Sequence, residues 1–425
     1  SQRSYVRRTI REDRLEDFDF DQFKRGYFRI ISSNTVKTFY PYYEQKQGDS
    51  LFFLKIKATK AAPWNFYLGG NISSSSLNQG YMGASYMRMS SMPWMVYFGA
   101  NIGKYYKGAN LRFRKDIGIN PLAYYDIETI IHQFDYYNGN QNLFKFDRIP
   151  NNIQLREMFA KVSVGTPLNI KSNMLAKFYI EGGQELFRYY RTGEYSSNDN
   201  PDRTFFNEIS AAIGLERNTQ NFLLYPTNGK RESIYARYIY ANETYKEGTN
   251  NASLFNNVDK NHNIFMFKAI IEDYFTITKW FHIGYLADLT ISSKFKMSNY
   301  YSTMMYSPAF EPIPHSKTLL MELYRVPSYF GGGVSPVFLF MKSLFIHSGV
   351  YYFQPYEKII ATSDGAYEYS GKFPKGGLIA NAALVWQSPF GPISLSCSYY
   401  EKGEHKWYPQ LNIGFLIFNK KRIEN

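Results

Sequence analysis

From residue 64 to the C-terminal end, the chain is a succession of segments in which apolar and polar side chains alternate with a period of two. Segment 208–216 is an example, in which one parity carries Ile209, Ala211, Ile213 and Leu215 and the other carries Glu208, Ser210 and Glu216. Many of these segments run for roughly 10 to 15 residues, whereas strands of soluble domains usually have about 5 or 6. Alternation of this length predicts an all-β fold whose strands cross a membrane, with one face in lipid and the other in water.

An apolar helix is the other way to cross a membrane, and the sequence offers none. It contains no run of about 18 apolar residues, and its mean hydropathy is −0.40. Only helices and closed barrels satisfy all their backbone groups in lipid. The 39 Tyr and 35 Phe residues suit strands and the aromatic girdles of membrane barrels. The sequence therefore predicts a transmembrane β-barrel.

Sixteen strands are expected, and single-chain bacterial barrels have an even number of antiparallel strands. Their predicted ranges are 64–73, 79–90, 94–104, 109–118, 122–134, 153–165, 170–184, 204–218, 231–244, 263–275, 281–295, 330–341, 343–355, 376–387, 392–401 and 408–418. Short and long connections alternate, as in barrels with periplasmic turns and extracellular loops. The longest connection, 296–329, is rich in apolar residues, and we expect it to fold into the lumen. The barrel domain is thus predicted over 61–418, followed by a polar tail over 419–425.

Residues 1–60 have a different pattern. Helices are expected over 4–11 and 19–29, the second with Asp19 or Asp21 near its N-terminus as a cap. Strands are expected over 36–45 and 51–57. This order of helix, helix, strand, strand predicts a small α/β unit in front of the barrel.

The charge and the single cysteine narrow the possible partners. The formal net charge is +13, but Lys and Arg are scattered rather than gathered in a nucleic-acid-binding module, so no nucleic acid is expected. A lumen lined with basic side chains, or contact with anionic lipid headgroups, would each explain the charge. Cys397 has no cysteine to pair with, and the histidines lack metal-ligand spacing. No metal or other cofactor is expected.

The C-terminal third carries motifs of a known superfamily. Gly376-Gly377-Leu378 is followed by Ser-Pro-Phe-Gly-Pro over 388–392 and by a last strand that ends at Phe418, and a Tyr-Pro-Thr-Asn-Gly turn occupies 225–229. The chain resembles the surface-antigen barrels, the superfamily of barrel-assembly proteins and two-partner secretion transporters. The resemblance implies periplasmic POTRA modules and a sixteen-stranded barrel in the outer membrane.

The N-terminal part sharpens this resemblance. Segments 23–29, 51–57 and 68–74 look like the junction in patatin-like phospholipase outer-membrane proteins, which carry a patatin hydrolase, one POTRA module and this barrel. A POTRA module starts with a strand before its two helices, and that strand is expected upstream of Ser1. The chain has neither an initiator Met nor a signal peptide. Residues 1–60 are therefore predicted to be a partial, periplasmic POTRA module in a processed or truncated product.

The resemblance also suggests candidate residues in the long inward loop, which in this superfamily carries an Arg-Gly-aromatic tip. The nearest match is 325–330, with Arg325, Tyr329 and Phe330 as candidates. The family often places an acid opposite that Arg, but 345–349 contains none. We therefore expect that the contact between the inward loop and the barrel wall is altered relative to the family.

The sequence lacks the hydrolase chemistry of a patatin. A Gly-x-Ser-x-Gly elbow would be needed, and 333–337 breaks that pattern at its last position. Asp364-Gly365-Ala366 resembles the end of a patatin dyad but lies in a turn-rich connection, where a turn is the simpler interpretation. The chain itself is therefore expected to have no catalytic residues.

Two functions follow from the resemblance. The first is a translocator or membrane anchor for an upstream patatin-like passenger that is absent from this chain. The alternative is an insertase of the barrel-assembly type, in which strand 64–73 pairs weakly with strand 408–418. Candidates for that seam are Gly69, Gly70 and Phe418. Expected partners are outer-membrane lipid and lipopolysaccharide, together with a passenger or client outer-membrane proteins. A passive porin is a third hypothesis, which the apolar inward loop disfavours.

Overall fold

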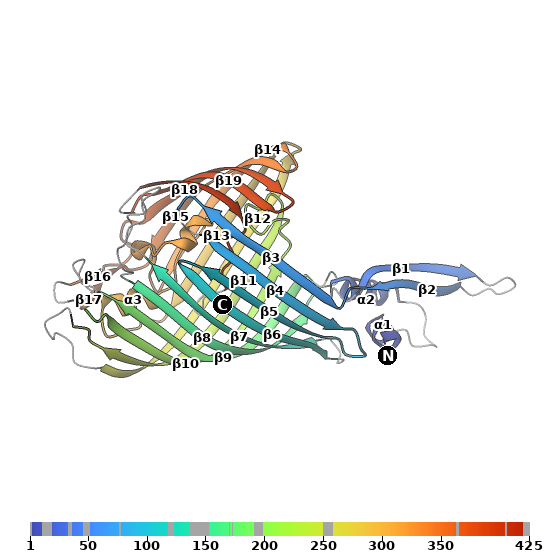
Figure 1. The fold of residues 1–425 in the computed structure, drawn as a ribbon, viewed down its shortest axis with the longest axis horizontal. Helices are drawn as coiled ribbons and strands as arrows, with labels where there is room; N and C mark the ends of the chain where they lie inside the picture. The colour runs from blue at the N-terminus through green and yellow to red at the C-terminus, as the bar shows by residue number, and fades with distance from the viewer. Residues whose placement is uncertain are drawn as a thin grey trace.

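A computed structural model describes residues 2–10, 19–32, 36–45, 52–75, 78–117, 123–136, 153–169, 171, 173–190, 199–249, 258–362, 365–403 and 406–419. Sixteen antiparallel strands form a closed barrel, and a small N-terminal unit lies at one end of it (Figure 1). The all-β class and the sixteen-stranded antiparallel barrel predicted from the sequence are therefore confirmed. In the part of the chain that the structure describes, no helix is long and apolar enough to span a membrane.

Each barrel strand pairs with its neighbours along the chain, and the last closes on the first. The strands are β3 (Trp64–Ser73), β4 (Gln79–Arg88), β5 (Trp94–Gly103), β6 (Tyr106–Ile117), β7 (Ala123–Tyr136), β8 (Ile153–Pro167), β9 (Met174–Tyr189), β10 (Asp202–Asn218), β11 (Gly229–Lys246), β12 (Val258–Thr278), β13 (Phe281–Ser292), β14 (Tyr329–Met341), β15 (Leu344–Pro355), β18 (Gly377–Ser388), β19 (Gly391–Tyr400) and β20 (Trp407–Gly414). Every predicted strand has its counterpart. The predicted C-terminal end of the last strand is wrong, because β20 stops at Gly414 rather than at Phe418.

The alternation of side chains sorts the strands into an apolar outer face and a mixed inner face. In β10, Ile209 and Ile213 are 56% and 65% exposed, whereas Glu208 and Ser210, on either side of Ile209, are buried. The exposed large hydrophobics continue around the wall on most strands. An apolar outer surface of this extent is what lipid covers in a membrane barrel.

The inner face carries charged side chains of both signs. Among the described residues, the charged side chains that are buried are mostly carboxylates: Asp126, Glu157, Glu181, Glu185, Asp202, Glu208, Glu243, Asp288 and Glu357, against Lys268, Arg237 and Arg325. Arg237 donates to Glu181 at 2.5 Å. Basic side chains of intermediate burial, such as Arg112, Lys161 and Lys177, are also paired with acids on the wall. A lumen lined with basic side chains stays a prediction.

The N-terminal unit consists of α1 (Gln2–Ile10), α2 (Phe20–Ser32), β1 (Val36–Gln45) and β2 (Phe52–Lys60). Asp19 caps α2, because its Oδ1 accepts from the backbone N–H groups of Asp21 at 2.9 Å and Gln22 at 3.1 Å. The two helices cross closely at Gly26, where a Cβ would lie 2.6 Å from the Thr9 carbonyl oxygen. The elements share a small apolar cluster formed by Tyr5, Ile10, Phe23, Ile30 and Phe39.

The two ends of the barrel differ. Met89, in the turn between β4 and β5, packs against the N-terminal cluster, so the short turns lie at the end that carries the N-terminal unit. At the opposite end lies the hairpin of β16 (Ile359–Ala361) and β17 (Tyr367–Tyr369) (Figure 1). The long connections, including the one between β13 and β14, open at that second end.

Candidate functional site

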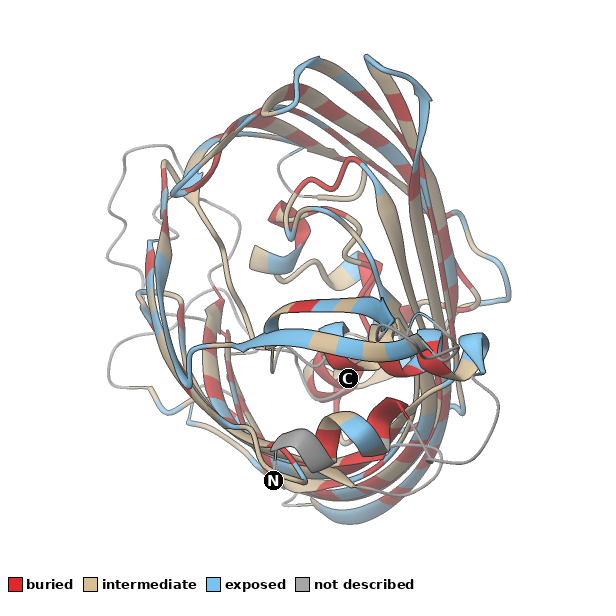
Figure 2. Cartoon of the chain, turned by 90° about the vertical axis from the view of Figure 1, so that its right-hand side faces the viewer, coloured by how far each residue is buried: buried red, intermediate tan, exposed pale blue. Residues whose placement is uncertain are grey.

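The connection from β13 to β14, residues 293–328, folds back into the barrel. It contains α3 (Tyr300–Tyr306), η1 (His315–Thr318) and η2 (Glu322–Tyr324). In the view along the barrel, short helices lie inside the ring of strands (Figure 2). Met304 and Phe310 are each only 1% exposed. We call residues 293–328 the inward segment.

The first half of the inward segment packs against the inner faces of β7 to β12. Its buried apolar side chains, Phe295, Met297, Met304, Met305 and Tyr306, join those of the wall, which include Phe187, Tyr189, Phe206, Ile239, Ile264 and Met266. The wall residues occupy the inward parity of their strands, where a water-filled pore would carry polar groups. The inward segment is apolar because it packs on this part of the wall, and this part of the wall is apolar because the segment covers it.

A group of hydroxyls ties α3 to β9 and β10. Asn299 caps the helix, since its side chain accepts from the Ser302 N–H at 3.0 Å, and its amide donates to the Tyr189 hydroxyl at 2.6 Å. The Ser302 hydroxyl lies 2.7 Å from that of Thr204 and 3.0 Å from that of Tyr189. All four residues are completely buried, so each bond forms away from bulk water.

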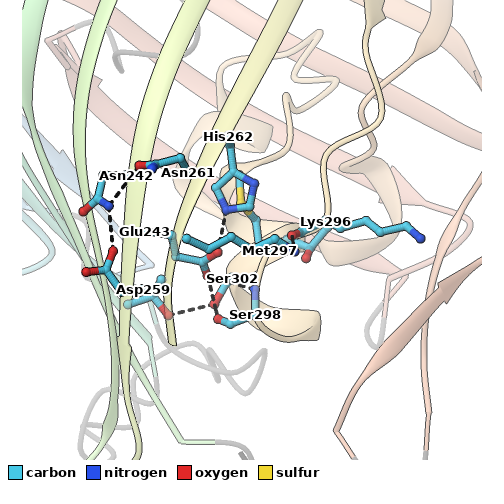
Figure 3. A network of polar contacts seen from close by, with 12 residues as sticks. Asn242, Glu243, Asp259, Asn261, His262, Lys296, Met297, Ser298 and Ser302 are labelled. Carbon is cyan, nitrogen blue, oxygen red and sulfur yellow. Dashed lines mark hydrogen bonds and ion pairs between the residues drawn. The ribbon is translucent and has the colours of Figure 1, made fainter. Parts of the chain in front are cut away.

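Glu243 of β11 is the second tether of the inward segment. Its carboxylate is fully buried and lies between His262 of β12 and the segment (Figure 3). One oxygen accepts from the Ser298 N–H at 2.8 Å and from the Ser298 hydroxyl at 2.5 Å. The other lies 2.8 Å from Nε2 of His262. A single charged group on the wall thus holds the start of α3.

The residues singled out from the sequence lie at the end of the inward segment and at the start of β14. Arg325 is 5% exposed and its guanidinium lies 3.4 Å from Glu311, which belongs to the same segment. The acid missing from 345–349 is therefore replaced within the segment itself. The Tyr329 hydroxyl lies 3.1 Å from Asp288 of β13 and 3.0 Å from the Ala309 carbonyl oxygen. Phe330 has the opposite parity and is 53% exposed on the outer face.

The run of three glycines after Phe330 makes room for the inward segment. A Cβ on Gly331 would overlap the ring of Phe310, which packs at 1% exposure against Tyr329 and Phe353. Space for a buried aromatic ring is the feature that requires Gly331.

Little free space remains between η1 and the wall. Two cavities that touch residues 315–318 have volumes of about 20 Å³ each, which is enough for about one water molecule. A polypeptide or a large solute would therefore need the inward segment to move before it could pass here.

The seam between β20 and β3 is the second feature of the site. Only three residue pairs join these strands, Asn412↔Ser73, Ile413↔Ile72 and Gly414↔Asn71. By contrast, β3 and β4 share eight pairs, and β11 and β12 share seventeen. On the seam side, residues 64–69 of β3 have no register partner in the described ranges, and Phe66 and Leu68 are 74% and 86% exposed.

Two glycines allow the strands to close at this seam. Gly414 has φ +100°, a conformation that favours glycine, and a Cβ there would overlap the carbonyl oxygen of Gly70. A Cβ on Gly70 would in turn overlap the carbonyl oxygen of Gln79. Gly69 is different, because a Cβ there would meet nothing within 4 Å.

The chain leaves the wall after Gly414 and turns into the lumen. Phe415 donates its N–H to the Gly70 carbonyl at 2.7 Å. Phe418 then packs on Tyr106 and Phe134, with ring centroids 5.0 and 5.4 Å away. Phe418 is thus an interior residue next to the seam rather than part of the last strand. The positive φ of Gly414 is the physical reason, because it ends the extended conformation.

Sequence reasoning missed the residues that hold the inward segment. Glu243, Glu311 and Tyr189 were not singled out. Glu243 lies on the predicted strand 231–244 at the inward parity, where any polar residue is expected, whereas Tyr189 lies beyond the end of the predicted strand 170–184. Their partners lie far away in sequence, 55 residues for the bond from Glu243 to Ser298. No local pattern marks such contacts.

No protein-family model and no curated protein matches the chain, but solved structures share its fold. BamA from Haemophilus ducreyi, in a crystal structure lacking POTRA domains 1-3, superposes with a TM-score of 0.60 at 13% identity, over 97% of this chain and 81% of that one. CdiB from Escherichia coli gives a TM-score of 0.52 at 9% identity, over 97% and 74%. CdiB from Acinetobacter baumannii gives 0.51 at 6% identity, over 97% and 71%.

These likenesses establish the fold. The barrel architecture that the sequence motifs led us to expect is the one that BamA and CdiB share with this chain. None of these three structures bears on a patatin-like domain.

Proposed function

We propose that this barrel lies in the outer membrane and assembles other outer-membrane proteins, with no catalytic residues of its own. The observation that carries the proposal is the seam of three residue pairs between β20 and β3. Its fold likeness to BamA supports the same function.

A short seam has a direct energetic consequence. Every backbone group in lipid needs a partner, so the joint with the fewest pairs is the one that opens most easily. Opening β11 from β12 would break seventeen pairs, whereas opening β20 from β3 breaks three pairs and the flanking bonds from Ser74 to Leu411 and from Phe415 to Gly70. The free edge of residues 64–69 then offers N–H and C=O groups to which a client strand can add. A client that forms its first hairpin there would enter the membrane sideways.

Translocation of a passenger through the lumen is the second candidate function. The observation that favours it is the inward segment, which fills the lumen and is held by side-chain hydrogen bonds that can be exchanged for water. The likeness to the CdiB barrels agrees with this candidate. The patatin-like passenger stays a prediction from the sequence.

We infer that the N-terminal unit is a periplasmic module of the POTRA type. Its order of helix, helix, strand, strand and its own apolar cluster support this inference. Its position at the end with the short turns agrees with the side on which such barrels have their periplasmic turns.

Two reversible cross-links separate the two candidate functions. In a Cys397→Ser background, Ser73→Cys with Asn412→Cys locks the seam. These positions form a cross-strand pair next to the hydrogen-bonded pair of Ser74 and Leu411, so their side chains lie close together. Thr204→Cys with Ser302→Cys locks the inward segment, because the two hydroxyls lie 2.7 Å apart.

The assay is insertion of an unfolded eight-stranded barrel protein into vesicles that contain the purified protein. We expect the oxidised seam lock to stop insertion and reduction to restore it. A cross-link between β3 and β4, Leu68→Cys with Met82→Cys, should leave insertion unchanged. Full insertion through the locked seam would refute the assembly function. Transport that stops only when the inward segment is locked would establish the lumen route instead.

The passenger hypothesis has its own test. The intact mass of the protein from native membranes is measured together with phospholipase activity on the same sample. A mass far above 49.7 kDa with lipase activity would support a patatin-bearing precursor. A mass near that value without activity would contradict it.

A further inference from the structure

An apolar pocket lies on the outer surface of the barrel, at the end opposite to the N-terminal unit. Its volume is about 380 Å³, within the range of small-molecule sites. One wall is formed by the last residues of β13 and the first of β14, including Leu289, Ile291 and Phe330. The other is formed by 354–357 and 369–373. We call this the rim pocket.

The rim pocket is continuous with the lipid-facing belt. Ile291 and Phe330 have the outward parity of their strands and are 50% and 53% exposed. Val334 and Val350, further along β14 and β15, are also about half exposed. A hydrocarbon chain in the adjacent leaflet can therefore enter the pocket without crossing a polar surface.

Phe373 marks the far side of the pocket and is in a strained conformation. Its φ is +53°, which is rare for a bulky residue. Its ring is 68% exposed and packs edge-on against Tyr356 at 5.3 Å. Strain of this kind persists where the surrounding structure holds it, and it gathers at ligand sites. Here it fixes an aromatic ring at the entrance of the pocket.

Lysines lie next to the pocket, since Lys294 lines it, and Lys358 and Lys372 are the sequence neighbours of the lining residues Glu357 and Phe373. Lys294 lies over the Tyr369 ring at 5.3 Å and 2.6 Å from Glu357. Lys372 lies over the Tyr356 ring at 5.7 Å. Lys358 follows Glu357 directly, and its ammonium donates to the Lys375 carbonyl at 2.5 Å.

These lysines are crowded by like charge. Burial, together with Lys402 and Lys375 nearby, lowers the pKa of Lys358. Lys375 is itself paired with Glu401 at 3.3 Å. In this cluster, the carboxylates of Glu357 and Glu401 are already paired with lysines. The cluster of cations therefore favours a further anion. This rim is one place where basic side chains of the chain gather.

We propose that the rim pocket binds an acylated lipid whose phosphate headgroup carries a net negative charge, with an acyl chain in the pocket and the phosphate on Lys294, Lys358 and Lys372. The acyl chain of such a lipid matches the apolar pocket, which is open to the belt. Its phosphate matches the lysines, which lie next to the pocket. Aromatic rings beneath Lys294 and Lys372 hold the two ammonium groups at the boundary.

The test is native mass spectrometry of the purified full chain in detergent with defined lipids. The probes are bisphosphorylated lipid A, phosphatidylglycerol, phosphatidylethanolamine and inorganic phosphate. We expect a single lipid A or phosphatidylglycerol molecule to stay bound. The variant with Lys294→Gln, Lys358→Gln and Lys372→Gln should lose at least five-fold in bound fraction, and so should Ile291→Trp, which fills the pocket.

Two matched variants serve as controls. Lys246→Gln removes an exposed lysine at the same end of the barrel on β11, and Ile213→Trp adds the same side chain on the outer face of β10. Both should bind lipid as the unaltered protein does. Equal loss in the controls, equal retention of phosphatidylethanolamine, or binding of inorganic phosphate alone would overturn the proposal. Gel mobility before and after heating verifies that each variant has folded.

Discussion

Replacing Glu243 by Gln tests whether the inward segment is held by a charged group of the wall. The carboxylate accepts from the Ser298 N–H and hydroxyl through one oxygen and contacts His262 through the other. Gln keeps the volume but removes the charge, so the two bonds from Ser298 go to a neutral acceptor and the side chain can meet His262 only as a donor. A hydrogen bond to a charged group contributes about 1.5–3 kcal/mol in water-soluble proteins, and about 0.6 kcal/mol on average in membrane proteins.

The expected loss for the docked segment is therefore about 1–3 kcal/mol, a rise of roughly 5- to 140-fold in the undocked population. The whole barrel should stay folded, since the strand register does not depend on this contact. The assay is maleimide labelling of Met304→Cys, a position 1% exposed, in a Cys397→Ser background. Labelling should be faster by that factor in the Glu243→Gln variant.

Asn242 provides a control from the adjacent position. Its side chain points to the other face of β11 and donates to Asp259 at 2.7 Å and Asn261 at 3.1 Å (Figure 3). Asn242→Ala should leave the labelling rate unchanged. If Glu243→Gln labels no faster than the unaltered protein, or if Asn242→Ala has the same effect, the carboxylate is not the tether.

Three further predictions concern the seam and the rim. Gly414→Val introduces a Cβ that overlaps β3 and requires an unfavourable φ, so thermal stability measured by gel mobility should fall by about 2–5 kcal/mol. Gly69→Ala adds a Cβ that meets nothing and should have no effect. Equal losses of stability in the two variants would contradict the close approach at Gly414. Phe418→Ala removes two aromatic contacts of about 0.5–1.5 kcal/mol each, and an unchanged midpoint of urea unfolding would show that the interior position contributes nothing. The Leu378 N–H lowers the pKa of Glu401, so this tether contributes stability above the ordinary glutamate pKa and loses it as pH falls through the lowered value; a protection factor of the Leu378 amide against exchange that does not fall in acid would contradict it.

The barrel could be predicted from the sequence because its strands follow a rule that is local. Outward and inward positions alternate in each strand, so Ile209 and Glu208 show their faces without knowledge of their neighbours. The ends of the strands could be predicted less well. Nothing in the apolar pattern of 408–418 distinguishes the wall from the residues inside it, and only the φ of Gly414 ends the strand.

The contacts within the lumen depend on pairs of residues far apart in sequence. The alternation places Glu243 inside the barrel but does not show that it meets Ser298. Tyr189, which meets Asn299, lies beyond the end of the predicted strand 170–184. The inward course of 296–329 was expected from its apolar residues, yet the partner of Arg325 was sought on the wrong element.

The unequal lengths of the strands have a consequence for the bilayer itself. With about 3.4 Å per residue and a tilt of about 40°, the 8 residues of β20 rise roughly 21 Å along the membrane normal, less than the apolar band of about 25 Å on such barrels. The 21 residues of β12 rise more than twice as far by the same arithmetic. Lipid beside the short strand must compress to match it, at a cost that grows with each ångström of mismatch. The protein therefore thins the bilayer on the side where its wall is weakest, and a polypeptide that enters the membrane there has less hydrocarbon to cross.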